Sequence, residues 1–182
     1  MHEQVVETTK ALLQSIAFQT ELDRYMQQFN AGFTMQVQGA NGQTYTKTVL
    51  QPITLKPFAQ VWVGEPPQDV PGPYPCAYVY HIVSEYPKED QEDDIVNGRH
   101  RCSVTIIDAG ATPEIAERTI GRLGTCVKRC IERNQYIYGQ IPGAFGMSSV
   151  TFVESEVTGQ HLSSVRVPYH ILFVAQVREV RY

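Results

Sequence analysis

The chain has 182 residues, of which 42% are hydrophobic and 19% charged, and its formal net charge at pH 7 is −4. These values are ordinary for a globular protein, and one domain over residues 1–182 is expected, burying about 70% of the surface that the unfolded chain exposes. The negative charge excludes the basic excess that drives binding to nucleic acid phosphates. No apolar run approaches the roughly 20 residues of a membrane span.

The N-terminus lacks a basic segment followed by an apolar core, so we expect no secretory signal and synthesis in the cytoplasm. Because buried cysteine is a common small core residue, we expect reduced thiols in place of disulfide bonds. The four cysteines all fall in apolar or regular segments: Cys76, Cys102, Cys126 and Cys130.

The first predicted element is a helix from Glu3 to Phe29, where apolar residues recur with a period of about 3.6. The next segment, Phe33–Leu55, predicts a two-stranded hairpin with its turn at Gly39–Gly42. Its strands are rich in Gln and Thr, which indicates exposure on at least one side. We therefore expect an arm that projects from the core and offers a surface for subunit contact.

Two strands and a stiff connection follow the predicted arm. Pro57–Gly64 predicts a short strand, and Glu65–Pro75 holds five of the eleven prolines, which favours an extended connection without regular structure. Cys76–Ser84 is apolar on both faces. That pattern predicts a central position in the sheet.

An acidic loop, Glu85–Asp94, leads into Asn97-Gly98, a pair that favours a tight turn, so we predict a long hairpin tip over residues 85–98. A solvated loop tip would account for the acidic residues, and so would a negative surface that repels nucleic acid or meets a basic partner. Calcium binding would need an alternating Asp/Asn ladder with a central glycine, which the loop lacks. The acidic residues are Glu85, Glu89, Asp90, Glu92, Asp93 and Asp94.

The most regular stretch is an alternating strand, Arg99–Asp108, followed by an amphipathic helix that extends to Asn134. Thr112-Pro113-Glu114 predicts the helix start, because threonine caps, proline suits the first helical position and an acid favours the positive helix end. Apolar residues then recur along one helix face at Ala116, Ile120, Leu123, Val127 and Ile131.

The rest of the sequence predicts a glycine- and aromatic-rich loop, Gln135–Ser149, and two strands, Val150–Val157 and Leu162–Tyr182. Pro168 in the last strand favours a sheet edge or a bulge. Together the elements predict an α+β fold: an antiparallel-rich sheet with two helices packed on one face, plus a projecting β-hairpin arm.

No catalytic motif is present, and His161 and His170 have no motif partner, so we predict a protein that is not an enzyme and needs no cofactor. Two alternatives stay open: a small α+β enzyme with its site in the Gln135–Ser149 loop, and a ligand-binding module. A metal site could be assembled from Cys102, Cys126, Cys130, His81 and His100. The close-spaced cysteine knuckles of zinc sites are missing, so we favour buried core residues and no metal.

The order of these elements resembles the tail terminator and tail-completion proteins at the neck of long-tailed bacteriophages. The likeness covers most of residues 58–182. The segments that carry it are Arg99-His-Arg-Cys-Ser-Val-Thr-Ile-Ile-Asp108, Thr112-Pro-Glu-Ile-Ala-Glu-Arg-Thr-Ile120 and Val165-Arg-Val-Pro-Tyr-His-Ile-Leu-Phe-Val-Ala175, after an N-terminal helix and an acidic hairpin.

This resemblance implies a structural virion protein that forms a six-fold ring in the neck. Such a ring caps the tail tube, ends its polymerisation and joins the tail to a head-side connector or stopper protein, while genome DNA passes through the lumen without specific binding. It also implies channels lined by acids, so the acidic loop 85–94 becomes a candidate lumen element. Another neck component, a stopper or connector, is the nearest alternative.

A ring requires heterologous contacts, in which one patch meets a different patch on the neighbouring subunit. The arm and the final strand are the segments that we expect to supply them, because unpaired strand edges invite pairing. With aromatic loop residues added, the predicted contact residues are Phe33, Met35, Val37, Tyr45, Val49, Tyr136, Tyr138, Phe145, Arg166 and Arg178.

Overall fold

The computed structural model describes residues 2–29, 34–48, 52–67, 70, 72–86, 88, 95–109, 113–134, 147–156 and 166–180. Its elements are α1 (His2–Leu13), α2 (Ile16–Phe29), β1 (Thr34–Gln38), β2 (Thr44–Thr48), β3 (Gln60–Val63), β4 (Cys76–Glu85), β5 (Ile95–Ala109), α3 (Pro113–Arg133), β6 (Met147–Glu156) and β7 (Arg166–Val180).

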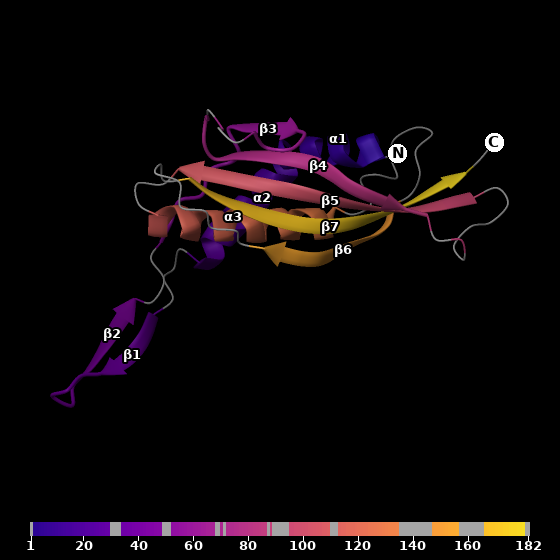
Figure 1. Ribbon diagram of the computed structural model, residues 1–182. Helices are drawn as coiled ribbons and strands as arrows, with labels where there is room; N and C mark the ends of the chain where they lie inside the picture. The colour runs from indigo at the N-terminus through magenta and orange to yellow at the C-terminus, as the bar shows by residue number, and fades with distance from the viewer. Residues whose placement is uncertain are drawn as a thin grey trace.

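A five-stranded sheet with the order β3-β4-β5-β7-β6 forms the body, and β1 and β2 form a separate two-stranded sheet (Figure 1). The β3–β4 pair is parallel, while β4–β5, β5–β7 and β6–β7 are antiparallel. The middle strand, β5, pairs with β7 along its whole length. The predicted α+β fold with an antiparallel-rich sheet is therefore confirmed.

The helices pack against one face of this sheet. Alternate residues of β5 (Cys102, Val104 and Ile106) face the same side as Ala77 and Val79 of β4, and all five belong to the main core cluster. Because each fully buried aliphatic side chain contributes about 1.5–3 kcal/mol, this layer holds the helices on the sheet. The helical members of the cluster are Val5, Val6, Leu12, Leu13, Phe18, Leu22, Leu123, Cys126, Val127, Cys130 and Ile131.

The opposite face of the sheet has a smaller core of its own. Tyr78 and Ile107 pack there with Val70, and the Trp62 ring stacks on Tyr78 with the ring centroids 4.9 Å apart. Val70 belongs to the proline-rich connection between β3 and β4. The described part of that connection has no regular structure, as predicted, but it also covers part of the second sheet face.

The predicted single helix over residues 3–29 is wrong in one respect, because the helix breaks between Leu13 and Ile16. Ser15 causes the break: its amide donates to the carbonyl of Leu12, and its hydroxyl oxygen accepts from the amide of Ala17 at 3.2 Å, capping α2. The described part of the body therefore has three helices.

The predicted edge position of the final strand is also wrong, because β7 lies between β5 and β6. The described pairing of β6 with β7 ends at His170, so at Pro168 β5 is the only neighbour of β7 among the described residues, and a residue without an amide hydrogen is tolerated there. The edge strands of the sheet are instead β3 and β6.

The Asn97-Gly98 pair forms no turn, because both residues lie inside β5 opposite β7. A Cβ atom at Gly98 would come within 2.9 Å of the His100 and Tyr86 rings, so this glycine is required for packing. The first residues of the predicted loop 135–149 lie outside the described part of the chain, but Met147–Ser149 belong to β6.

A buried ion pair joins α2 to the end of α3. Glu21 is 4% exposed, and Nη1 of Arg133 donates to its two carboxylate oxygens at 2.6 and 2.7 Å. Arg24 also donates to Glu21, at 2.8 Å. A buried carboxylate is costly unless it is paired, so these contacts fix how the two helices meet.

We predict that Arg133→Ala lowers the free energy of unfolding by about 2 kcal/mol, since it removes two charge-assisted hydrogen bonds from a buried carboxylate. Chemical denaturation measures this loss. The matched control is Arg118→Ala on the same helix, where the ion pair with Glu114 is exposed and about 0.5 kcal/mol is expected. Equal losses in the two variants would contradict a special role for the buried pair.

Candidate functional site

The arm formed by β1 and β2 has one apolar and one polar face. Met35 lies opposite Lys47 and Val37 lies opposite Tyr45, and residues that are paired directly across two strands project to the same side. We call Met35, Val37, Tyr45 and Lys47 the arm face. The described side chains on the other side are all Thr or Gln: Thr34, Gln36, Gln38, Thr44 and Thr46.

The arm face is open to solvent. Met35 is 48% exposed and Tyr45 is 53% exposed, and the arm extends away from the body of the protein (Figure 1). The predicted turn is confirmed, since the amide of Gly39 donates to Gln43 and Gly42 has a φ of 77°, which favours glycine. An isolated two-stranded hairpin is only marginally stable in water, so packing of the arm face against another surface would stabilise the arm.

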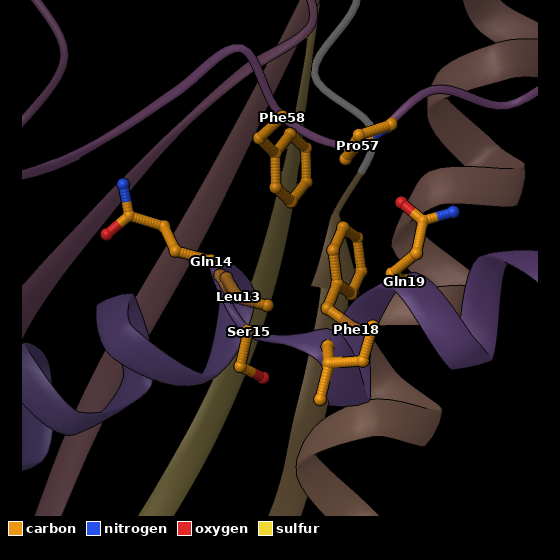
Figure 2. A pocket seen from close by; sticks show the side chains of 8 residues that line it. Leu13, Gln14, Ser15, Phe18, Gln19, Pro57 and Phe58 are labelled. Atoms are coloured by element: carbon orange, nitrogen blue, oxygen red, sulfur yellow. The ribbon is translucent and has the colours of Figure 1, made fainter.

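A second exposed surface is an uncharged hollow at the junction of α1 and α2, which we call the α1–α2 hollow (Figure 2). Its volume is about 420 Å³, and the Phe18 and Phe58 rings stack beside it with their centroids 5.0 Å apart. Ile16 is 80% exposed at its rim. All its lining residues are uncharged: Leu13, Gln14, Ser15, Ile16, Phe18, Gln19, Pro57 and Phe58.

Of the predicted contact residues, the structure brings Met35, Val37 and Tyr45 together on the arm face. Arg166 and Arg178 lie near opposite ends of β7, opposite Ala109 and Asn97 of β5. The remaining predicted contact residues lie outside the described part of the chain: Phe33, Val49, Tyr136, Tyr138 and Phe145.

Of the predicted acidic loop, the structure describes Glu85, which is exposed at the end of β4 and lies opposite Arg99 of β5. The other acids of that loop lie outside the described residues: Glu89, Asp90, Glu92, Asp93 and Asp94. The loop therefore stays a prediction from charge, attached to the body at the ends of β4 and β5.

Sequence reasoning missed a polar cluster in which Ser84 lies between two histidines. Its hydroxyl oxygen is 2.8 Å from Nε2 of His81 and 2.8 Å from Nδ1 of His100, and the side chain of His100 is fully buried. Residues three apart on a regular strand point to opposite faces, but an irregularity between His81 and Val83 brings His81 and Ser84 together. No sequence pattern signals this bulge.

We predict that Ser84→Ala lowers the free energy of unfolding by roughly 1–3 kcal/mol, because it removes a hydrogen-bond partner from the buried His100 ring. The matched control is Ser103→Ala in the neighbouring strand. The hydroxyl of Ser103 is buried and has no hydrogen-bond partner within the described structure, so this change should be neutral or stabilising. Thermal and chemical unfolding of both variants test the contrast, and an equal loss would contradict it.

The cysteines of the suggested metal site are buried core residues. None of the three forms a disulfide bond, and burial raises the pKa of the Cys102, Cys126 and Cys130 thiols to about 12. The thiolate is the form that binds metals. No three His, Cys, Asp or Glu side chains among the described residues are grouped as they would be around a metal ion.

We predict that a thiol reagent at pH 8 leaves these cysteines unmodified in the folded protein and reacts with them in denaturant. The free energy of unfolding should also fall as the pH rises above about 9, because the unfolded chain releases thiol protons that the folded chain retains up to about pH 12. Rapid modification of the native protein would contradict this burial.

Among the described residues, no helix is both long and apolar enough to cross a membrane. No protein family model matches the chain, and no curated protein sequence matches it. A solved chain described as "Virion of native gene transfer agent (GTA) particle" is similar over 65% of this chain and 78% of its own length, with a TM-score of 0.43 and 13% identity. At these values the likeness assigns neither a family nor a function.

Proposed function

We propose that this chain is a structural protein of a phage-type virion neck. In this role, copies of the chain form a ring that caps the tail tube, ends its polymerisation and joins the tail to a head-side connector. The observation that carries the proposal is the arm, because Met35 and Tyr45 are about half exposed on one face of a hairpin that projects from the body (Figure 1). Such a face is suited to contact with another protein chain.

The order of elements supports this assignment. The alternating strand and the amphipathic helix that carry the resemblance to tail terminator proteins correspond to β5 and α3, and the closing strand corresponds to β7. The resemblance implies a hexamer, which needs two different patches on each subunit. The arm would supply one such patch. The second patch was expected on the final strand, but β7 is an interior strand of the sheet, so the second patch would lie on another surface of the body.

The acidic loop fits a position at the lumen or rim of such a ring. Fixed negative charge at short range opposes the adsorption of DNA phosphates, whereas Lys or Arg would hold them. Glu85 is exposed where the loop begins, and the net charge of the chain has the same sign. DNA would then slide through the channel without specific binding.

We predict that the purified protein forms rings with a central hole, alone or on the ends of tail tubes. Deletion of Thr34–Val49 should leave a folded monomer that cannot form them. Thr34 and Thr48 are paired across the hairpin, so the deletion joins neighbouring points of the chain and should spare the body. Native mass and negative-stain images measure assembly, and circular dichroism checks folding.

Normal ring formation by the deletion variant would contradict the role of the arm. A compact dimer without a hole, in the presence and absence of tail tubes, would contradict the neck function itself. If a structure of the assembled ring places the acidic loop on the outer wall, the proposed lumen position of the loop is wrong, although the proposed ring is supported. The nearest alternative, a head-completion stopper or connector, would bind the portal side and leave tail tubes uncapped.

A further inference from the structure

Two exposed surfaces of this chain complement each other in shape. The arm face offers two large projecting side chains, Met35 and Tyr45, while the α1–α2 hollow is an uncharged recess beside the stacked Phe18 and Phe58 rings. Neither surface is covered by another segment of the described fold, since Met35, Tyr45 and Ile16 are all exposed. We propose that the arm face of one copy of this chain docks into the α1–α2 hollow of a second copy.

The charges of the two surfaces are compatible with this contact. Every residue that lines the hollow is uncharged, and the arm face has one charged residue, Lys47, next to Met35 in the pairing register. Burial of Met35 and Tyr45 in the hollow would therefore desolvate no ionised group of the lining. Aromatic and methionine side chains are enriched at the centres of protein interfaces, and both kinds occur here.

The size of the hollow also fits. A volume of about 420 Å³ falls in the range of sites that enclose a small molecule, so it can accept one or two side chains such as Tyr45 and Met35. The exposed Ile16 at the rim would be covered at the same time. Ile16 has the highest exposed fraction, 80%, of the large apolar side chains in the described part of the chain. Its burial would therefore remove a large apolar area from water, which is favourable.

The direction of the arm favours a second copy over the same chain. The hollow lies at the beginning of α2, whereas the arm follows the end of this helix. A helix of 14 residues separates these points by roughly 20 Å, and the arm extends away from the body (Figure 1). Contact between an arm and the hollow of a neighbour joins two different patches, which is the arrangement that closes a ring.

Docking into a hollow explains the arm better than strand addition does. An arm that added to the free edge of β3 or β6 would use its backbone groups and leave the arm face as exposed as before. Packing of the face into a concave surface covers Met35 and Tyr45 together. It also supplies the additional contacts that an isolated hairpin needs for stability.

Disulfide trapping tests the contact directly. We would introduce Gln14→Cys, in the lining of the hollow, and Lys47→Cys, on the arm face, into the same chain and oxidise the protein at pH 8. Both positions are exposed, so folding should be unaffected, and the side chains of Ile16, Met35 and Tyr45 are kept. The native thiols are buried and form no disulfide bond, so they should not compete. The expected result is a ladder of covalent dimers, trimers and larger species on a non-reducing gel, with at least ten times less of it in the control pair Gln14→Cys with Thr46→Cys.

Thr46 is the matched control because it precedes Lys47 in the same strand and projects from the opposite side of the hairpin. Equal ladders from the two pairs, or no ladder from either, would overturn the proposal. A disulfide confined to the monomer would also overturn it, by showing that the arm folds back onto its own hollow.

The proposal deepens the neck function and rests on it for the ring, but the two can fail separately. Rings that form without a cross-link between positions 14 and 47 of the double-cysteine variant would refute the docking and leave the neck function standing. A cross-linked ladder from closed dimers or open chains, without rings on tail tubes, would support the docking and refute the neck function.

Discussion

The fold depends on the packing of the helices against one face of β4 and β5. Alternate side chains of β5 enter the main core, so its register determines what α3 and the N-terminal helices can cover. A shift of one residue would turn Cys102, Val104 and Ile106 to the other face and bring polar side chains under the helices. The Glu21–Arg133 ion pair then fixes the angle at which α2 meets the end of α3. The β1–β2 arm is attached to the body that these contacts hold together.

The sequence predicts this central layer well, because β5 and α3 each have a strong hydrophobic period that no competing signal disturbs. Predictions failed where the tertiary setting decides the outcome. Asn97-Gly98 has the composition of a turn, yet Gly98 is needed for its lack of a side chain beside His100 and Tyr86. Pro168 has the character of an edge residue, and the local end of β6 allows it inside the sheet. The helix break at Ser15 comes from a single capping hydroxyl within a continuous apolar pattern.

The candidate contact surfaces also differ in whether the sequence pattern or the tertiary contacts determine them. The arm was predictable from composition, and its two-faced character follows from the alternation of Met35 and Val37 with Gln36 and Gln38 once the register is known. The α1–α2 hollow could not be predicted, because Phe58 joins it from a segment that is distant in the sequence. The Ser84 cluster depends on a bulge that leaves no mark in the residue pattern.

The position of β7 in the sheet has a consequence for synthesis. β5 gains its second neighbour only after α3 and β6 have left the ribosome, since β7 comes after both in the chain and lies between β5 and β6 in the sheet. Until then one long side of the middle strand has open backbone groups, and nascent chains of this kind are exposed to aggregation. The sheet can therefore be completed only after β7 has been synthesised. A chain that stalls before β7 would keep this side of β5 open.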